Sequence, residues 1–369
     1  MDQQNIILNR QLKINSYAKI NLFLDIIKKM PEPAGYHEIM TLFSSIELCD
    51  TMHFYISTLE HVPDFIAKSL KLNYKKTSSG VINMQCENLK VVLCAEEETE
   101  KCYSVPVDDS NTVAIAVKKF FDFVPFKKLD KTLFLYILFD KNIPAGAGLG
   151  GGSSDAASTL RALNLLFELN QTDDELTAIA KKVGADVAFM LKGGATLACG
   201  IGEKFDKQYD FAPWPLVLIY PNFEVSSRDA YAGVKNFIKY NLSNLSEEDE
   251  IKLRNVAQER AGRIADCLAG KNFGEIGKHI FNKLEEPVLS RKHQIRELKE
   301  TLRQMGYENV LMTGSGSSVY TLLDPSSTQE ELNVHFEKIR TEMQRKFSKT
   351  YKVILTKTRK ASPWEKILS

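Results

Sequence analysis

The chain has 369 residues, and its 48 lysines and arginines nearly balance 47 aspartates and glutamates, so the formal net charge is +1. This balance excludes a protein that gathers nucleic acid or anionic membranes through bulk charge. No segment reaches the roughly 18 apolar residues of a membrane span, and the N-terminal residues lack a secretory signal pattern. The six cysteines form no CxxC pair, which is typical of reduced thiols. We therefore expect a cytoplasmic protein, and its length predicts two domains, residues 1–210 and 211–369.

The first third of the chain is expected to be mostly β-structure. Residues 16–27 and 47–57 are rich in β-branched and aromatic side chains, which favours strands. A polar break that contains Gly35, Tyr36 and His37 separates them. Residues 57–105 are weakly patterned and predict an irregular excursion, with short strands at 81–85 and 91–94. A helix over 111–121 and a strand over 132–139 follow.

The remainder of the chain mixes helices and strands without a regular alternation, which predicts an α+β fold. A helix is expected to end near residue 169, and Thr172 and Glu175 form a capping-box pattern that opens the next helix. Gly184-Ala-Asp-Val187 is expected to end that helix, before a hairpin near 193–202. Further on, the sequence predicts strands at 216–220, 310–312, 319–323 and 352–356, and helices at 228–240, 247–262, 288–305 and 328–346.

Five glycines fall within seven residues, between the strand at 132–139 and the following helix. A glycine cluster implies unusual dihedrals or close approach of another group to the backbone. A helix start presents free N–H groups and the positive end of the helix dipole, which favour an anion. Two serine hydroxyls follow directly. The pattern predicts a phosphate-binding loop, and the alternative is a hinge with a serine N-cap. The residues are Gly146, Gly148, Gly150, Gly151, Gly152, Ser153 and Ser154.

Two common phosphate loops fit poorly. The Walker A motif needs a lysine before its Ser or Thr, and this loop has none. Residues 146–151 do satisfy GxGxxG, but a dinucleotide-binding unit would also need an early βαβ unit and an acidic residue after the next strand. Here about 140 largely strand-like residues precede the motif and a helix follows it.

Residues 144–154 instead closely resemble the phosphate loop of the galactokinase, homoserine kinase, mevalonate kinase and phosphomevalonate kinase (GHMP) superfamily. Other segments share this resemblance in family order, and the most similar branch phosphorylates 4-diphosphocytidyl-2-C-methyl-D-erythritol. The segments are Ala18-Lys-Ile-Asn-Leu-Phe23, Gly35-Tyr-His37 with Thr41-Leu-Phe43, Gly184-Ala-Asp-Val187 and Thr313-Gly-Ser-Gly316.

The resemblance implies an ATP- and Mg²⁺-dependent kinase that transfers phosphate directly to the 2-hydroxyl of this substrate, in the non-mevalonate route to isoprenoid precursors. It also implies an N-terminal, ATP-binding domain of the ribosomal protein S5 domain 2-like type and a ferredoxin-like C-terminal domain, with the active site between them. The expected partners are small molecules, not nucleic acid or membrane, and a homodimer is allowed. The sequence leaves the metal ligands unassigned.

The resemblance also implies roles for individual residues. Asp186 would be the general base, and Lys19 would balance its charge. Asp155 follows the two serines and would repel phosphates unless it turns away or helps to hold Mg²⁺, so it is left without a role. The ATP site would comprise Asn111, Pro144, Gly146, Gly148, Leu149, Gly150, Gly151, Gly152, Ser153 and Ser154. The substrate site would comprise Asn21, Tyr36, His37, Ser227 and Tyr231, and the third glycine motif Thr313, Gly314, Ser315 and Gly316.

Two alternatives stay open at this point. A different kinase of the superfamily, acting on a mevalonate-type or sugar substrate, would share the ATP loop without needing Tyr36 and His37. A non-catalytic nucleotide sensor of the same fold would bind ATP without turnover, but it would not be expected to keep both Lys19 and Asp186.

Overall fold

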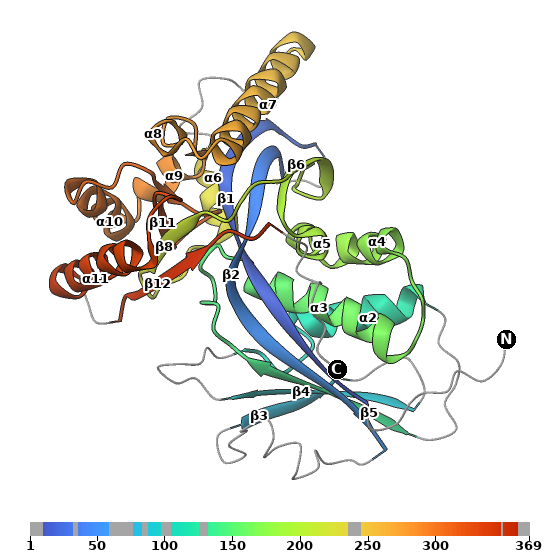
Figure 1. Cartoon of the computed structure of the whole chain (residues 1–369). Helices are drawn as coiled ribbons and strands as arrows, with labels where there is room; N and C mark the ends of the chain where they lie inside the picture. The colour runs from blue at the N-terminus through green and yellow to red at the C-terminus, as the bar shows by residue number, and fades with distance from the viewer. Residues whose placement is uncertain are drawn as a thin grey trace.

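The computed structural model describes residues 10–31, 36–58, 77–82, 88–96, 105–124, 132–234, 245–347 and 350–360 (Figure 1). These residues form two β-sheets with helices packed against them, so the predicted α+β class is confirmed. No helix among the described residues is both long enough and apolar enough to cross a membrane.

A long antiparallel ribbon organises the larger sheet. It consists of β1 (Gln11–Lys29) and β2 (His37–Ser57). On its other side β2 pairs with two different strands: residues 39–44 pair with β6 (Ala195–Gly200), and residues 51–57 pair with β5 (Leu133–Asp140). The strand β6 continues into a hairpin with β7 (Lys204–Tyr209). Residues 45–50 of β2 pair with neither neighbour, and the candidate site lies beside this point.

Part of the 57–105 excursion extends the edge of this sheet. The strand β4 (Leu89–Glu96) pairs in parallel with β5, and β3 (Thr77–Ile82) pairs with β4 in antiparallel fashion. The strand expected at 91–94 is confirmed within β4. The one expected at 81–85 begins earlier and ends at Ile82 as β3, and residues 83–87 lie outside the described part. The rest of the excursion lies outside the described residues.

Helices α2 (Thr112–Phe123), α3 (Gly151–Leu166), α4 (Asp173–Val183) and α5 (Ala185–Lys192) pack beside the ribbon (Figure 1). The apolar positions of α3 recur at steps of three and four, and Ala156, Leu160 and Leu163 are fully buried in one cluster with strand residues such as Ile137. The Thr172 capping box begins α4 as predicted. This packing fixes the N-terminus of α3 against the ribbon.

The second sheet is antiparallel, in the order β10 (Val310–Met312), β11 (Val319–Leu322), β8 (Pro215–Tyr220), β12 (Lys352–Lys357). The short strand β9 (Phe281–Asn282) belongs to this half of the sequence but pairs in parallel with β1 of the first sheet. The division at residues 210 and 211 stays a prediction. The helices of this half are α6 (Ser227–Gly233), α7 (Glu247–Ala269), α8 (Phe273–Ile276), α9 (Glu285–Leu289), α10 (His293–Gln304) and α11 (Gln329–Lys346).

Several boundaries differ from the sequence prediction, among them the ends of β1 and α7, which extend beyond the predicted 16–27 and 247–262. The helix expected at 288–305 is two helices, α9 and α10, and between them the Arg291 side chain donates to the carbonyl oxygens of Pro287 and Asp229. Gly184 ends α4 but also begins α5, so the segment at 184–187 starts a helix. The strand β2 begins at His37 instead of near residue 47. Of the helix expected at 228–240, residues 228–233 belong to α6, and residues 235–244 lie outside the described part.

Candidate active site

The glycine loop at 144–150 joins β5 to the N-terminus of α3. Gly150 precedes the helix in the left-handed region (φ 71°), which glycine adopts without a steric penalty. No side-chain hydrogen bond caps α3. The alternative interpretation of this segment, a hinge with a serine N-cap, is therefore wrong. The uncapped first turn leaves backbone N–H groups for an anion, as the sequence predicts.

A second glycine segment touches this loop from the far end of the chain. Gly148 has φ +76°, and a Cβ atom there would lie 2.4 Å from the carbonyl oxygen of Thr313. A Cβ on Gly314 would lie 3.2 Å from both the Gly148 oxygen and the Lys19 Nζ. The Ser318 N–H also donates to the Ala147 oxygen at 3.2 Å. The two segments can approach this closely because both carry glycine where their backbones meet.

Lys19 and Asp186 lie together, as the resemblance implies. The Lys19 side chain is almost fully buried; its Nζ donates to Asn21 Oδ1 at 2.8 Å and lies 3.8 Å from Asp186 Oδ2. Desolvation lowers the pKa of Lys19, although the charge of Asp186 opposes the shift. Asp186 lies in the first turn of α5, and its side chain is 38% exposed. A buried cation thus faces a carboxylate that a substrate can reach.

Asn21 is held by both sheets. Its Nδ2 donates to Thr41 Oγ1 at 2.8 Å, and its backbone N–H donates to Thr313 Oγ1 at 3.1 Å. The Tyr320 hydroxyl donates to the Asn21 carbonyl oxygen at 3.0 Å. These bonds fix the orientation of the amide that accepts from Lys19.

The residues expected at the cytosine base form a separate group beside the pair. The rings of His37 and Tyr231 stack with centroids 5.7 Å apart, while Tyr36 is 50% exposed. Desolvation lowers the pKa of His37, and the charge of Lys29 lowers it further by a smaller amount. The Nδ1 atom of His37 has no hydrogen-bond partner among the described residues. Desolvation and the charge of Asp186 raise the pKa of Tyr231. A base between two rings needs roughly 7 Å, twice the spacing of stacked bases, so it does not fit between His37 and Tyr231 in this arrangement.

Most of these residues line one cavity of about 540 Å³. Six predicted residues are not among its lining: Leu149, Ser154, Thr313, Gly316, Tyr36 and His37. Ser154 is buried, and its hydroxyl donates to the Tyr17 oxygen at 2.8 Å, so it anchors α3 to β1 instead of facing the cavity. The predicted residues in the lining are Lys19, Asn21, Asn111, Pro144, Gly146, Gly148, Gly150, Gly151, Gly152, Ser153, Asp186, Ser227, Tyr231, Gly314 and Ser315.

Two of the lining residues also have local structural bonds. Asn111 caps α2 and accepts a hydrogen bond from the Val113 N–H at 2.8 Å. Ser227 Oγ lies 2.9 Å from Ser315 Oγ, which links α6 to the third glycine motif.

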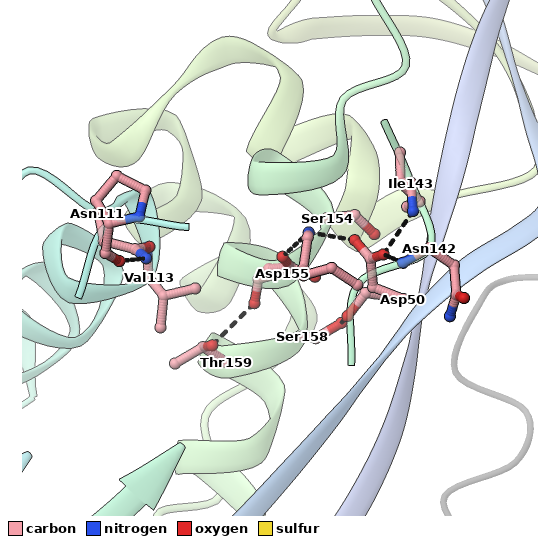
Figure 2. A network of polar contacts seen from close by, with 12 residues as sticks. Asp50, Asn111, Val113, Asn142, Ile143, Ser154, Asp155, Ser158 and Thr159 are labelled. Carbon is pink, nitrogen blue, oxygen red and sulfur yellow. Dashed lines mark hydrogen bonds and ion pairs between the residues drawn. The ribbon is translucent and has the colours of Figure 1, made fainter. Parts of the chain in front are cut away.

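The sequence reasoning missed a buried charge cluster behind the loop. The Lys141 ammonium donates to carboxylates of Asp50 and Asp155. Asp50 Oδ1 also accepts the N–H groups of Asn142 and Ile143 (Figure 2). Asp155 therefore turns toward Lys141. Desolvation, followed by the charge of Asp155, raises the pKa of Asp50 to about 7, against the opposing effect of Lys141. The signal in the sequence was the unexplained Asp155 together with a lysine three residues before the loop proline.

Comparison with known proteins identifies the class to which the fold belongs. The family described as GHMP kinases N terminal domain matches residues 111–194, and that described as GHMP kinases C terminal matches residues 264–338. A solved homoserine kinase from Cytophaga hutchinsonii has a TM-score of 0.62 over 98% of both chains, at 14% identity. A crystal structure of 4-(cytidine 5'-diphospho)-2C-methyl-D-erythritol kinase has a TM-score of 0.60 over 94% of this chain and 98% of that one, at 24% identity. Fold and site thus define the class as the GHMP kinases, which use ATP as the phosphate donor.

Curated relatives narrow the class. The 4-diphosphocytidyl-2-C-methyl-D-erythritol kinase of Gloeothece citriformis is 30% identical over 86% of this chain and 88% of its own length. The protein of the same name from Caldanaerobacter subterraneus subsp. tengcongensis is 32% identical over 84% of this chain and 87% of its own. The chain belongs to the family of 4-diphosphocytidyl-2-C-methyl-D-erythritol kinases.

Proposed function

We propose that this chain transfers the γ-phosphate of ATP to the 2-hydroxyl of 4-diphosphocytidyl-2-C-methyl-D-erythritol. The observation that carries the proposal is that the Lys19–Asp186 pair lines the same cavity as the uncapped N-terminus of α3. One wall can receive phosphates while the other presents a base. The relatives' names supply the acceptor.

The residues divide the reaction between them. The acceptor oxygen attacks the γ-phosphorus, the bond from phosphorus to ADP breaks, and the hydroxyl proton passes to the Asp186 carboxylate. Lys19 compensates the negative charge that gathers at the acceptor and the transferred group. Asn21 holds the Lys19 ammonium at 2.8 Å, which keeps this charge in place before substrate arrives.

The loop and the start of α3 fit an ATP phosphate chain. Backbone N–H groups of the first turn and the positive end of the helix dipole favour bound anions. Gly148 and Gly150 leave room because neither carries a side chain. We propose that Mg²⁺ would accompany ATP and neutralise part of its charge. The Ser153 hydroxyl lies in the cavity wall and is an oxygen ligand that could contact it.

The cytidine group would bind beside His37, Tyr36 and Tyr231. The buried Nδ1 of His37 has no hydrogen-bond partner among the described residues, and a base edge would supply one. Tyr36 is half exposed, and a base stacked on its ring would contribute about 1–3 kcal/mol. Since His37 and Tyr231 already contact each other, we propose that the base lies against this pair and not between its rings.

An acceptor panel tests the function. Purified protein with ATP and Mg²⁺ is offered the diphosphocytidyl compound, mevalonate, homoserine and galactose, and ADP and the product mass are measured. We expect ADP and a phosphorylated product with the cytidine-bearing acceptor alone. Turnover with another acceptor would indicate a different kinase of the superfamily, and ATP binding without turnover would indicate a sensor.

A further inference from the structure

A buried charge cluster lies behind the phosphate loop, and the reaction described above gives it no role. It consists of Asp50, Lys141 and Asp155, which are 0%, 4% and 1% exposed. Asp50 lies in β2, just before the segment that pairs with β5. Asp50 pairs with Ser16 of β1 on one side, while on the other side it lies between the segments of β2 that pair with β6 and with β5. The chain leaves β5 next to this point to form the loop.

The first link of the cluster holds the start of the loop. Asp50 Oδ1 accepts the N–H of Asn142 at 2.6 Å and that of Ile143 at 2.7 Å, the two residues before Pro144 (Figure 2). Its other oxygen accepts from the Lys141 ammonium. One carboxylate of the ribbon therefore fixes three consecutive residues where the chain turns away from the sheet.

The second link holds the end of the loop. The same Lys141 ammonium donates to Asp155 Oδ2 at 2.5 Å, and Asp155 lies in the second turn of α3. Both ends of the loop are thus tied to Asp50, one directly and one through Lys141. A segment with this many glycines has little conformational preference of its own, so its shape depends on where its ends are held.

We propose that Asp50, Lys141 and Asp155 form a clamp that positions the phosphate loop for ATP. Lys141 and Asp155 also line the cavity, and Asp155 Oδ1 has no hydrogen-bond partner among the described residues. We assign all three as positioning residues because every described bond that they make goes to the protein. The inference rests on the proposed function only in that ATP binds at this loop; it does not depend on the identity of the acceptor.

The test measures ATP affinity without any acceptor. Titration calorimetry with MgATP is performed on the wild type, Asp50→Ala and Asp50→Asn, and hydrogen exchange is followed over residues 145–153. Asparagine keeps one oxygen for the two backbone N–H groups but turns an NH₂ group toward Lys141, so it breaks only the link to α3. The clamp predicts a graded rise in Kd, about threefold to tenfold for Asp50→Asn and more than tenfold for Asp50→Ala, with faster exchange in the loop.

A matched control separates position from stability. Ile179→Ala removes a fully buried side chain of α4, away from the loop, and should lower stability while leaving the Kd for ATP and loop exchange unchanged. Wild-type Kd in folded Asp50→Ala and Asp50→Asn would overturn the clamp. If Asp50→Ala does not fold, the Kd of Asp50→Asn for ATP decides alone: a threefold to tenfold rise supports the clamp, and a wild-type Kd overturns it. If the Asp50 variants show the graded rise in Kd for ATP but the acceptor assay shows no turnover, the proposed substrate is rejected and the clamp is retained.

Discussion

Replacing Gly148 with alanine should separate the two glycine segments that form the site. The residue has φ +76°, where an L-residue costs about 1–2 kcal/mol. The new Cβ would lie 2.4 Å from the Thr313 oxygen, and since ordinary contact begins near 3.4 Å, the segments must move apart by about 1 Å. A misplacement of about 1 Å in an active site can cost roughly 100-fold in rate. We therefore expect kcat to fall by about 100-fold.

The assay is steady-state ADP release at saturating acceptor, with urea unfolding to measure stability. Gly262→Ala is the control, because a Cβ at this position in α7 meets nothing within 4 Å and alanine favours helix by about 1 kcal/mol. That variant should keep full activity. A folded Gly148→Ala protein with kcat within threefold of wild type would refute the argument that the close approach of the two segments sets the site.

Two further predictions concern pH. Because burial lowers the pKa of Lys19 below its ordinary 10.5, its ammonium is lost as pH rises through that lowered value, so kcat should fall on the basic side before pH 10.5. Lys19→Arg, weaker but permanently charged, should lack this limb, and an unchanged limb in its profile would assign it to another group. Because burial lowers the pKa of His37 below 6.5, the ring is neutral near pH 7. The KM for the acceptor should rise only as pH falls below 6.5, while the KM for ATP stays constant. In His37→Gln the acceptor KM should not depend on pH. If the KM values for ATP and for the acceptor rise equally as pH falls, His37 does not contact the base.

The local signals in the sequence predicted the elements on which the phosphate site depends. The strand before the loop, the glycines and the apolar spacing of α3 each act over a few residues, so they are visible without knowledge of the fold. Residues 37–46 of β2 were missed because Thr41, Ser44 and Ser45 are buried there. A strand covered on both faces loses the alternation that identifies strands.

Tertiary contacts explain the other differences. The break between α9 and α10 occurs where Arg291 reaches the Asp229 oxygen of α6, a contact that no local pattern reveals. The two helices that share Gly184 follow from its extended backbone (φ 176°) between them. The resemblance predicted the Lys19–Asp186 pair, but the bond from Lys141 to Asp50 joins residues 91 positions apart, and nothing local to either residue predicts it.

The most direct test of the account is the rate of phosphoryl transfer in a single turnover of Asp186→Asn, with enzyme in excess and both substrates saturating. Asparagine keeps the shape of the side chain but cannot accept the proton at neutral pH. If Asp186 is the base, the rate falls 10²–10⁴-fold below wild type, with the Kd for ATP unchanged. A variant that binds ATP normally and keeps most of the wild-type transfer rate would contradict the assignment of Asp186 as the base.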